Sequence, residues 1–161
     1  MELGSLPEFP VTDDHIHIDP RNGKGIEAAK EFRRAGGTHL FLVTKPSWSL
    51  GVAPSCGEDF RTVFDETIAI ARDIETIGLT VFPVLGVHPA EITRLTGRMA
   101  LSEAAEVMKG GLTLAARYVA EGKAVAIKSG RPHYPAEADV MDASNGILLH
   151  ALTLAKETGC A

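Results

Sequence analysis

The chain has 161 residues, of which 45% are apolar and 23% are charged, a composition that excludes a disordered or fibrous protein and suits one domain with a core. Its net charge of -5 argues against a general nucleic-acid or membrane-surface binder, which would be basic. Cys56 and Cys160 are too few and too isolated for a disulfide framework or a cysteine zinc site, and no signal peptide or membrane span is visible, so we expect a soluble protein of the reducing cytoplasm.

Short apolar runs alternate with longer helical runs along the first half of the chain. Strands are predicted over Thr12–Asp19 and Thr38–Thr44, and helices over Gly25–Gly36 and Glu58–Ile77. In the second of these helices the apolar residues recur near a period of 3.6, which is typical of a helix with one buried face. The run Lys45–Gly57 is rich in Pro, Ser and Gly and is predicted to be a loop.

The second half continues the same alternation. It is predicted to contain a strand over Leu79–Val87, helices over Pro89–Thr96 and Ser102–Glu121, a strand over Lys123–Ser129 and a helix over Ala138–Thr158. We expect Pro83 to distort the third strand and the pair Gly110-Gly111 to break or kink the long helix.

Four strand–helix units in strict alternation predict an α/β fold with a parallel sheet and right-handed crossovers. A four-stranded flavodoxin-like sheet is one alternative, but it would want a phosphate-binding glycine-rich loop after the first strand. A (β/α)8 TIM barrel takes about 250 residues for its eight units. We therefore interpret residues 1–161 as one domain, the N-terminal half of a barrel, truncated or completed by another chain. Its open edges are expected to expose interior side chains such as Val125 and Ile127 and to favour self-association.

The first strand ends in Asp14-His15-Ile16-His17, a candidate metal site. Because side chains alternate along a strand, His15 and His17 are expected on one face, where their imidazoles can converge on one cation. Asp14 belongs to the opposite face, and Asp19 could orient a ligand. The alternative is a pair of surface histidines, but the C-terminal ends of barrel strands are where active sites are built.

Two further predicted strands end in a residue that could take part in catalysis, at the same edge of the predicted sheet. His88 follows the third strand in Gly86-Val87-His88-Pro89, and Lys128 ends the otherwise apolar fourth strand. We predict an active-site role for both; the alternatives are a structural histidine and a lysine that reaches solvent from a strand end.

The loop after the fourth strand groups a cation, an imidazole and a phenol. Arg131 could clamp an anionic group with its two guanidinium nitrogens, or it could be a solvated loop residue. His133 and Tyr134 follow directly, and His133 is predicted to be catalytic together with Arg131 and His88. Lys45 lies at the same edge, and Trp48 is interpreted as a packing residue rather than a lid.

The three motifs His15-x-His17, Gly86-Val87-His88-Pro89 and Gly130-Arg131-Pro132-His133-Tyr134, in this order, resemble the TatD-like branch of the amidohydrolase (urease-type) superfamily, particularly its archaeal predicted metal-dependent hydrolases. The resemblance implies a (β/α)8 barrel with one or two divalent metals, zinc or manganese, held in part by His15 and His17. The remaining ligands, usually two histidines and an aspartate, would lie beyond Ala161.

The chain departs from the family pattern at Lys128, where the commonest TatD pattern has a metal-bridging glutamate. Related barrels carboxylate a lysine at this place with CO₂, so the resemblance implies a carboxylated Lys128 as a metal ligand. It also implies hydrolysis of a phosphoester or an amide-like C–N bond, with nucleic acid a partner only as substrate. Two alternatives stay open: a PHP-type phosphoesterase and a non-catalytic half barrel.

Overall fold

The computed structural model describes residues 9–160 and has strands and helices in alternation. The elements in chain order are β1 (Thr12–Ile16), α1 (Ile26–Arg34), β2 (His39–Val43), the short helices η1 (Ser47–Leu50) and η2 (Gly57–Phe60), α2 (Arg61–Glu75), β3 (Thr80–Gly86), α3 (Glu91–Thr96), α4 (Leu101–Ala120), β4 (Ala126–Lys128) and α5 (Ala138–Thr158). Every predicted strand and helix is present, with ends that differ by a few residues at most sites.

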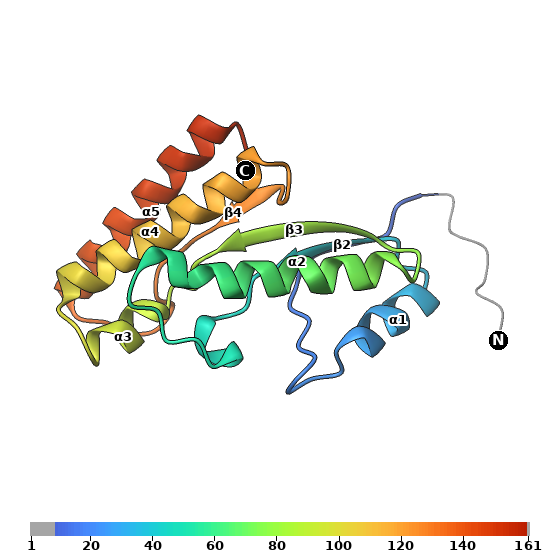
Figure 1. Ribbon diagram of the computed structural model, residues 1–161, viewed down its shortest axis with the longest axis horizontal. Coiled ribbons are helices and arrows are strands. Elements are labelled where there is room, and N and C mark those ends of the chain that lie inside the picture. The colour runs from blue at the N-terminus through green and yellow to red at the C-terminus, as the bar shows by residue number, and fades with distance from the viewer. Residues whose placement is uncertain (1–8, 161) are drawn as a thin grey trace.

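The four strands form one parallel sheet in the order β1-β2-β3-β4 (Figure 1). This confirms the predicted fold class, an α/β fold consistent with part of a TIM barrel. Because all strands run the same way, their C-terminal ends meet at one edge, which we call the carboxyl edge.

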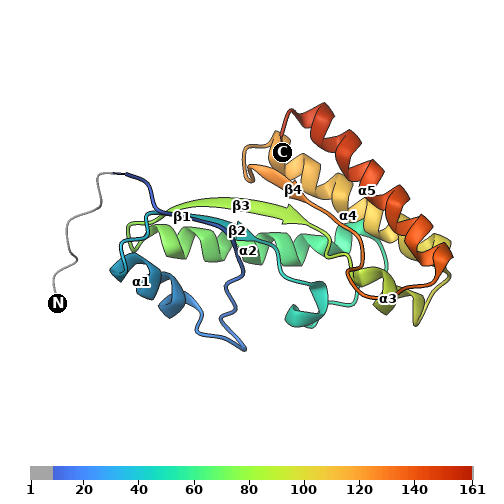
Figure 2. The same ribbon diagram turned by 180° about the vertical axis from the view of Figure 1, so that it is seen from behind.

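Two apolar clusters hold the helices on the sheet. In the smaller cluster, Leu40 and Leu42 of β2 and Val81 of β3 pack against α1 and α2, and α2 lies along the sheet in both views (Figures 1 and 2). The larger cluster joins α2 and α3 to the neighbouring pair α4 and α5. Leu85 of β3 and Ile147 of α5 are buried within it. Residues on the helix-covered face of the sheet are therefore the core, and the opposite face, which we call the inner face, carries the alternate residues.

The register places Phe41, Phe82 and Val84 on the inner face, where the two phenyl rings lie 5.0 Å apart. Val84 is opposite Ala126 and Gly86 is opposite Lys128, so Ala126 and Lys128 also face inward.

The prediction that Val125 and Ile127 point into the barrel is therefore wrong. Ile127 is opposite the fully buried Leu85 and packs against the helix-side cluster, while Val125 is 41% exposed and borders a groove next to α2. The physical reason is the two-residue period of the strand: a strand that turns Lys128 inward must turn Ile127 outward.

Two expected interruptions, one of β3 and one of α4, are absent from the described residues 9–160. Pro83 pairs with Leu42 in an unbroken β2–β3 register, because its missing N–H lies on the β4 side, where its carbonyl accepts from Val125 N at 2.9 Å. Helix α4 continues through Gly110-Gly111. A Cβ at Gly110 would lie 3.0 Å from Gly57 Cα, so glycine here allows a close approach and does not end the helix.

At Gly86 the backbones of β3 and β4 approach closely, and replacement of this glycine tests the packing of the two strands. A Cβ there would lie 1.9 Å from the carbonyl oxygen of Lys128, a backbone atom that cannot move aside without displacing β4. We expect Gly86→Ala to lower the free energy of unfolding by about 1–3 kcal/mol or more, measured by urea denaturation. The matched control is Gly146→Ala in α5, where no atom lies within 4 Å and alanine should raise stability by up to about 1 kcal/mol. Equal effects of the two variants would contradict the close approach.

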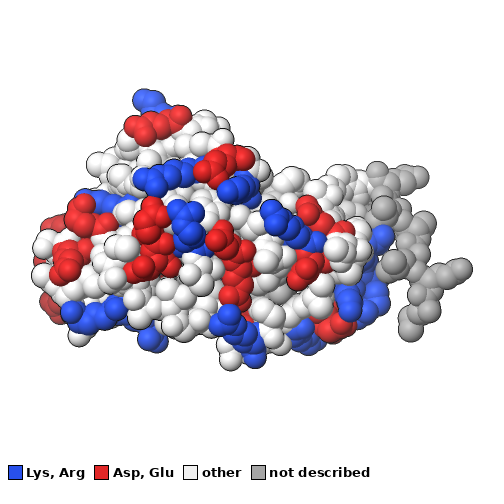
Figure 3. Space-filling model, viewed as in Figure 1, with Lys and Arg blue, Asp and Glu red and all other residues white. Residues whose placement is uncertain are grey.

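The helix-covered side in view in Figure 3 carries acidic and basic side chains in alternation. Among the ion pairs of the described residues, the Arg117–Glu58 bridge at 2.9 Å joins α4 to η2, and others, such as Lys30–Glu27 at 2.6 Å, are local. Such a surface lacks the single-sign field that a nucleic-acid footprint would need. None of the helices within residues 9–160 is long and apolar enough to cross a membrane.

Candidate metal and active site

The first two candidate ligands lie together at the carboxyl edge, as predicted. The His15 and His17 rings have centroids 5.1 Å apart in an edge-on arrangement. A shift in the β1–β2 register between Asp13 and Ile16 turns Ile16 toward the helix-side core, and both imidazoles are exposed at the end of the strand. Strand geometry thus brings two nitrogen donors to one place.

The hydrogen bond of His17 fixes which of its nitrogens is free. Its Nδ1 lies 2.8 Å from the carbonyl oxygen of Val43, and because a carbonyl can only accept, Nδ1 carries the proton. Nε2 is left with a lone pair, the form in which histidine binds a metal, and metal-binding histidines commonly donate their other N–H to a carbonyl in this way. The ring is partly covered where it meets Val43, and this partial burial, followed by the charges of Lys128, His15 and Lys45, lowers the pKa of His17 although the Val43 bond opposes this, which favours the neutral ring.

This donor set fits part of a metal site. His15 and His17 supply two neutral imidazoles of the kind that zinc and manganese accept. Within residues 9–160, however, no group of three or more histidine, cysteine, aspartate or glutamate side chains is placed to hold a metal ion. A complete coordination sphere therefore needs ligands of another residue type, or ligands from outside residues 9–160.

Lys128 lies at the same edge of the sheet, near enough for its charge to act on His17. It is on the inner face at the end of β4, and its Nζ donates to the carbonyl oxygen of Thr44 at 3.3 Å. Burial lowers the pKa of the amine to about 8, and its charge in turn lowers the pKa of both His17 and His88.

His88 follows β3 and is half-buried at the same edge. Its Nδ1 accepts the backbone N–H of Ala90 at 3.2 Å, which puts the ring proton on Nε2. Burial, then the charges of Lys128, His17 and His133, lowers the pKa of His88 to about 4. The ring is therefore neutral at neutral pH and can donate one hydrogen bond from Nε2.

In the loop after β4, one predicted residue lies near the site histidines and two others form hydrogen bonds to helices. His133 is exposed and near enough for its charge to act on His88. Arg131 is also exposed, but its guanidinium donates to Asn145 Oδ1 of α5 at 3.2 Å, so the structure does not bring it together with the imidazoles. Tyr134 contacts Thr93 of α3 through a 2.6 Å hydrogen bond between hydroxyls. The roles of Arg131 and His133 stay predictions.

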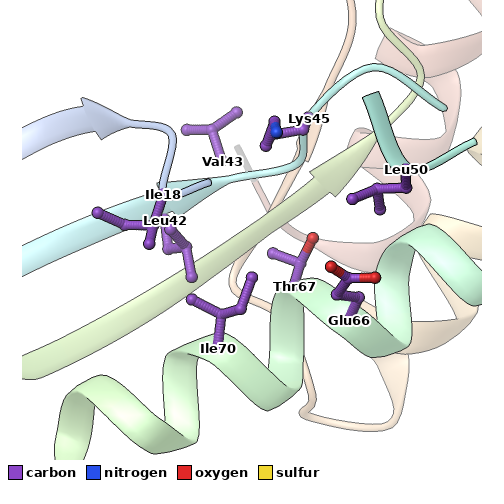
Figure 4. Close-up of a pocket in the computed structure, with 8 residues that line it drawn as sticks. All are labelled: Ile18, Leu42, Val43, Lys45, Leu50, Glu66, Thr67 and Ile70. Carbon is purple, nitrogen blue, oxygen red and sulfur yellow. The ribbon is translucent and has the colours of Figure 1, made fainter. Parts of the chain in front are cut away.

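Lys45 lies at the carboxyl edge, as predicted, and is paired with Asp19. Asp19 also accepts the backbone N–H groups of Arg21 and Asn22, each at 2.9 Å, and the Lys45 ammonium is the largest of the influences that hold the pKa of Asp19 far below its usual range. Asp19 thus anchors the β1–α1 loop. Beneath Lys45, a cavity of about 10 Å³ between the sheet and α2 is too small for a ligand (Figure 4).

Sequence reasoning missed the contact that joins the loops after β2 and β3. Glu91 of α3 is buried, and its carboxylate accepts from Ser47 N at 2.7 Å and from Ser47 Oγ at 2.9 Å. Burial raises the pKa of Glu91, while the bonds from Ser47 act in the opposite direction. An acid at a helix start is ordinarily interpreted as a favourable charge there, and the only available signal was its place three residues after His88.

These features define an α/β protein whose polar site lies at the carboxyl edge of a parallel sheet, the edge at which barrel enzymes build their active sites. The chain belongs to the TatD-related DNase family, whose model matches residues 12–161.

A curated relative is an uncharacterised protein of Methanocaldococcus jannaschii, 37% identical over 163 residues that cover 97% of this chain and 54% of that protein. The chain thus spans about half the length of this relative. No solved structure matches the chain.

Proposed function

We propose that this chain forms the first half of a metal-dependent hydrolase site that cleaves phosphoesters, with DNA as the substrate. The observation that carries the choice of a phosphoester is the charge of the site. The cationic side chains that act on His17 are Lys128 and Lys45, and Lys128 also acts on His88; where Lys128 is carboxylated, the divalent cation that it helps to hold would keep the site positive. A site with this excess of nitrogen donors favours an anionic phosphoryl group over a neutral amide. The description of the family as TatD-related DNases supports the same substrate.

In this proposal His15 and His17 hold a divalent cation, zinc or manganese, together with Lys128. One or two ions are expected, and placement in the amidohydrolase superfamily would make a carboxylated Lys128 the bridging group. We expect the remaining ligands to come from the part of the family's barrel that this chain does not span. A divalent cation here would supply a hydroxide nucleophile at neutral pH and offset the charge that develops on the phosphoryl group.

The chain's own residues orient the substrate. His88 donates a hydrogen bond from Nε2 to a phosphoryl oxygen and, with its pKa of about 4, does not serve as a proton donor at neutral pH. His133 and Arg131, which are exposed in the loop after β4, are proposed to contact the substrate at the carboxyl edge. For Arg131, this requires the guanidinium to leave Asn145.

A non-catalytic protein is the second candidate, favoured by the incomplete ligand set within residues 9–160. A PHP-type phosphoesterase would instead bind three metals and give Lys128 no role.

The test is a comparison of substrates with the manganese-loaded protein in which this chain is completed by the rest of the barrel. We expect hydrolysis of bis(p-nitrophenyl) phosphate and of single-stranded DNA. The rate enhancement over the uncatalysed reaction should be at least about 100-fold smaller for p-nitroacetanilide than for these phosphodiesters. Faster cleavage of the anilide would contradict the phosphoester, and a fully metal-loaded protein with no hydrolysis of either would favour the non-catalytic alternative.

A further inference from the structure

The side chain of Trp48 contacts His88. It lies in η1, after β2, and its ring centroid is 5.7 Å from that of His88 in an edge-on arrangement. The guanidinium of Arg94, from α3, lies over the Trp48 ring at 4.5 Å. The indole is thus held between the site histidine and a helix that begins three residues after that histidine.

Glu91 ties the segment that carries Trp48 to α3. Its side chain is 1% exposed, and both carboxylate oxygens are occupied by Ser47, the residue next to Trp48. Ser47 is itself 2% exposed. A buried carboxylate costs free energy that only good hydrogen bonds offset, and an apolar pair of similar volume would join two loops as well. What the carboxylate adds is a fixed position, since it holds the backbone N–H and the hydroxyl of one residue at once.

We propose that Glu91 is a positioning residue, which through Ser47 holds Trp48 against His88 and so fixes the direction in which His88 presents its Nε2 proton to the substrate. The inference rests on the proposed function only in its last step, the contact between His88 and substrate. Arg94, one helical turn after Glu91, adds a second contact from α3 to the indole ring.

The chain has a single tryptophan, so its fluorescence reports on this contact alone. We expect Glu91→Gln, which keeps the shape but replaces one of the two acceptor oxygens by an amide NH₂ that can only donate, to shift Trp48 emission to longer wavelength. It should also raise the acrylamide quenching constant at least about twofold, since the loosened indole meets water. In NMR spectra the Hε1 proton of His88 should move as the Trp48 ring leaves it. Ser47→Ala, which removes the hydroxyl but keeps the N–H, should show a smaller change of the same kind.

The control is Glu103→Gln, which removes an exposed carboxylate from α4 and should leave all signals unchanged. On a phosphodiester, kcat should fall about tenfold in Glu91→Gln with little change in KM, because a misdirected donor costs transition-state rather than ground-state binding. Trp48→Phe should retain more activity than Trp48→Ala.

A folded Glu91→Gln protein with unchanged emission and an unchanged His88 resonance would overturn the proposal, as would changed spectra with wild-type kcat. If the wild-type protein hydrolyses no phosphodiester, the proposed function fails. The fluorescence and NMR arms would still decide whether Glu91 positions Trp48 and His88.

Discussion

Replacement of His17 by alanine is expected to weaken manganese and zinc binding at least about 100-fold. Removal of a mere hydrogen-bond partner of a metal ligand typically costs 10–100-fold, and here a ligand itself is lost. His17 is the better oriented of the two histidines, because its bond to Val43 O leaves Nε2 free. Isothermal titration of the metal and elemental analysis after dialysis measure the effect, and phosphodiester hydrolysis should fall with metal content.

The control for this variant is His39→Ala. His39 lies on the same inner face but at the opposite end of β2, where it bonds to Thr38 Oγ1 and stacks on Phe82. Loss of an imidazole from this end should leave metal affinity unchanged. Equal metal content in wild type and a His15→Ala/His17→Ala double variant would refute the assignment of these residues as ligands.

Replacement of Lys128 by alanine is expected to remove activity and at least one metal, and Lys128→Glu is expected to restore a substantial part of both. The amine can add to CO₂ only when neutral: its nitrogen forms the new N–C bond, a proton is released, and the product is an anionic carbamate. A pKa of about 8 leaves roughly a tenth of the amine neutral at pH 7 and most of it neutral at pH 9. Carboxylation should therefore decline as the pH falls below about 8, and metal occupancy in bicarbonate should follow it.

The two variants separate a bridging anion from other roles of this lysine. An alanine variant with full activity and unchanged metal content would exclude Lys128 from the site. If Lys128→Ala and Lys128→Glu are equally inactive, the lysine acts as a cation, for instance on a phosphoryl group. A mass increase of 44 Da on Lys128 in metal-loaded protein would be direct support for the carbamate.

Much of the fold followed from periodicity alone. Alternating short and long apolar runs predicted the strands and helices, and the position of His15 and His17 at a strand end predicted that their rings would meet. These features depend on neighbours in sequence, which is the range over which strand and helix periods act.

The predictions were wrong or incomplete where contacts between segments that are distant in sequence determine the position or partner of a residue. The pair Gly110-Gly111 looked like a helix break, but Gly110 lies against the backbone of Gly57 in η2, and Gly111 lies against the side chains of Phe60 and Val87. Likewise, the partner of Glu91 is Ser47, 44 residues away, and that of Lys45 is Asp19 on another loop. The inward direction of Lys128 required the register with Gly86, which fixes Ile127 on the other face.

The central proposal is that this chain, completed by the rest of the family's barrel, hydrolyses phosphodiesters with the aid of a metal at His15 and His17. The most direct measurement is the rate of bis(p-nitrophenyl) phosphate hydrolysis by the wild-type protein before and after metal is removed with a chelator, and after manganese or zinc is returned. The rate should fall to background without metal and recover with it, and the His15→Ala/His17→Ala double variant should not recover. A rate that is unchanged by removal of the metal, or fully recovered in the double variant, would contradict the account.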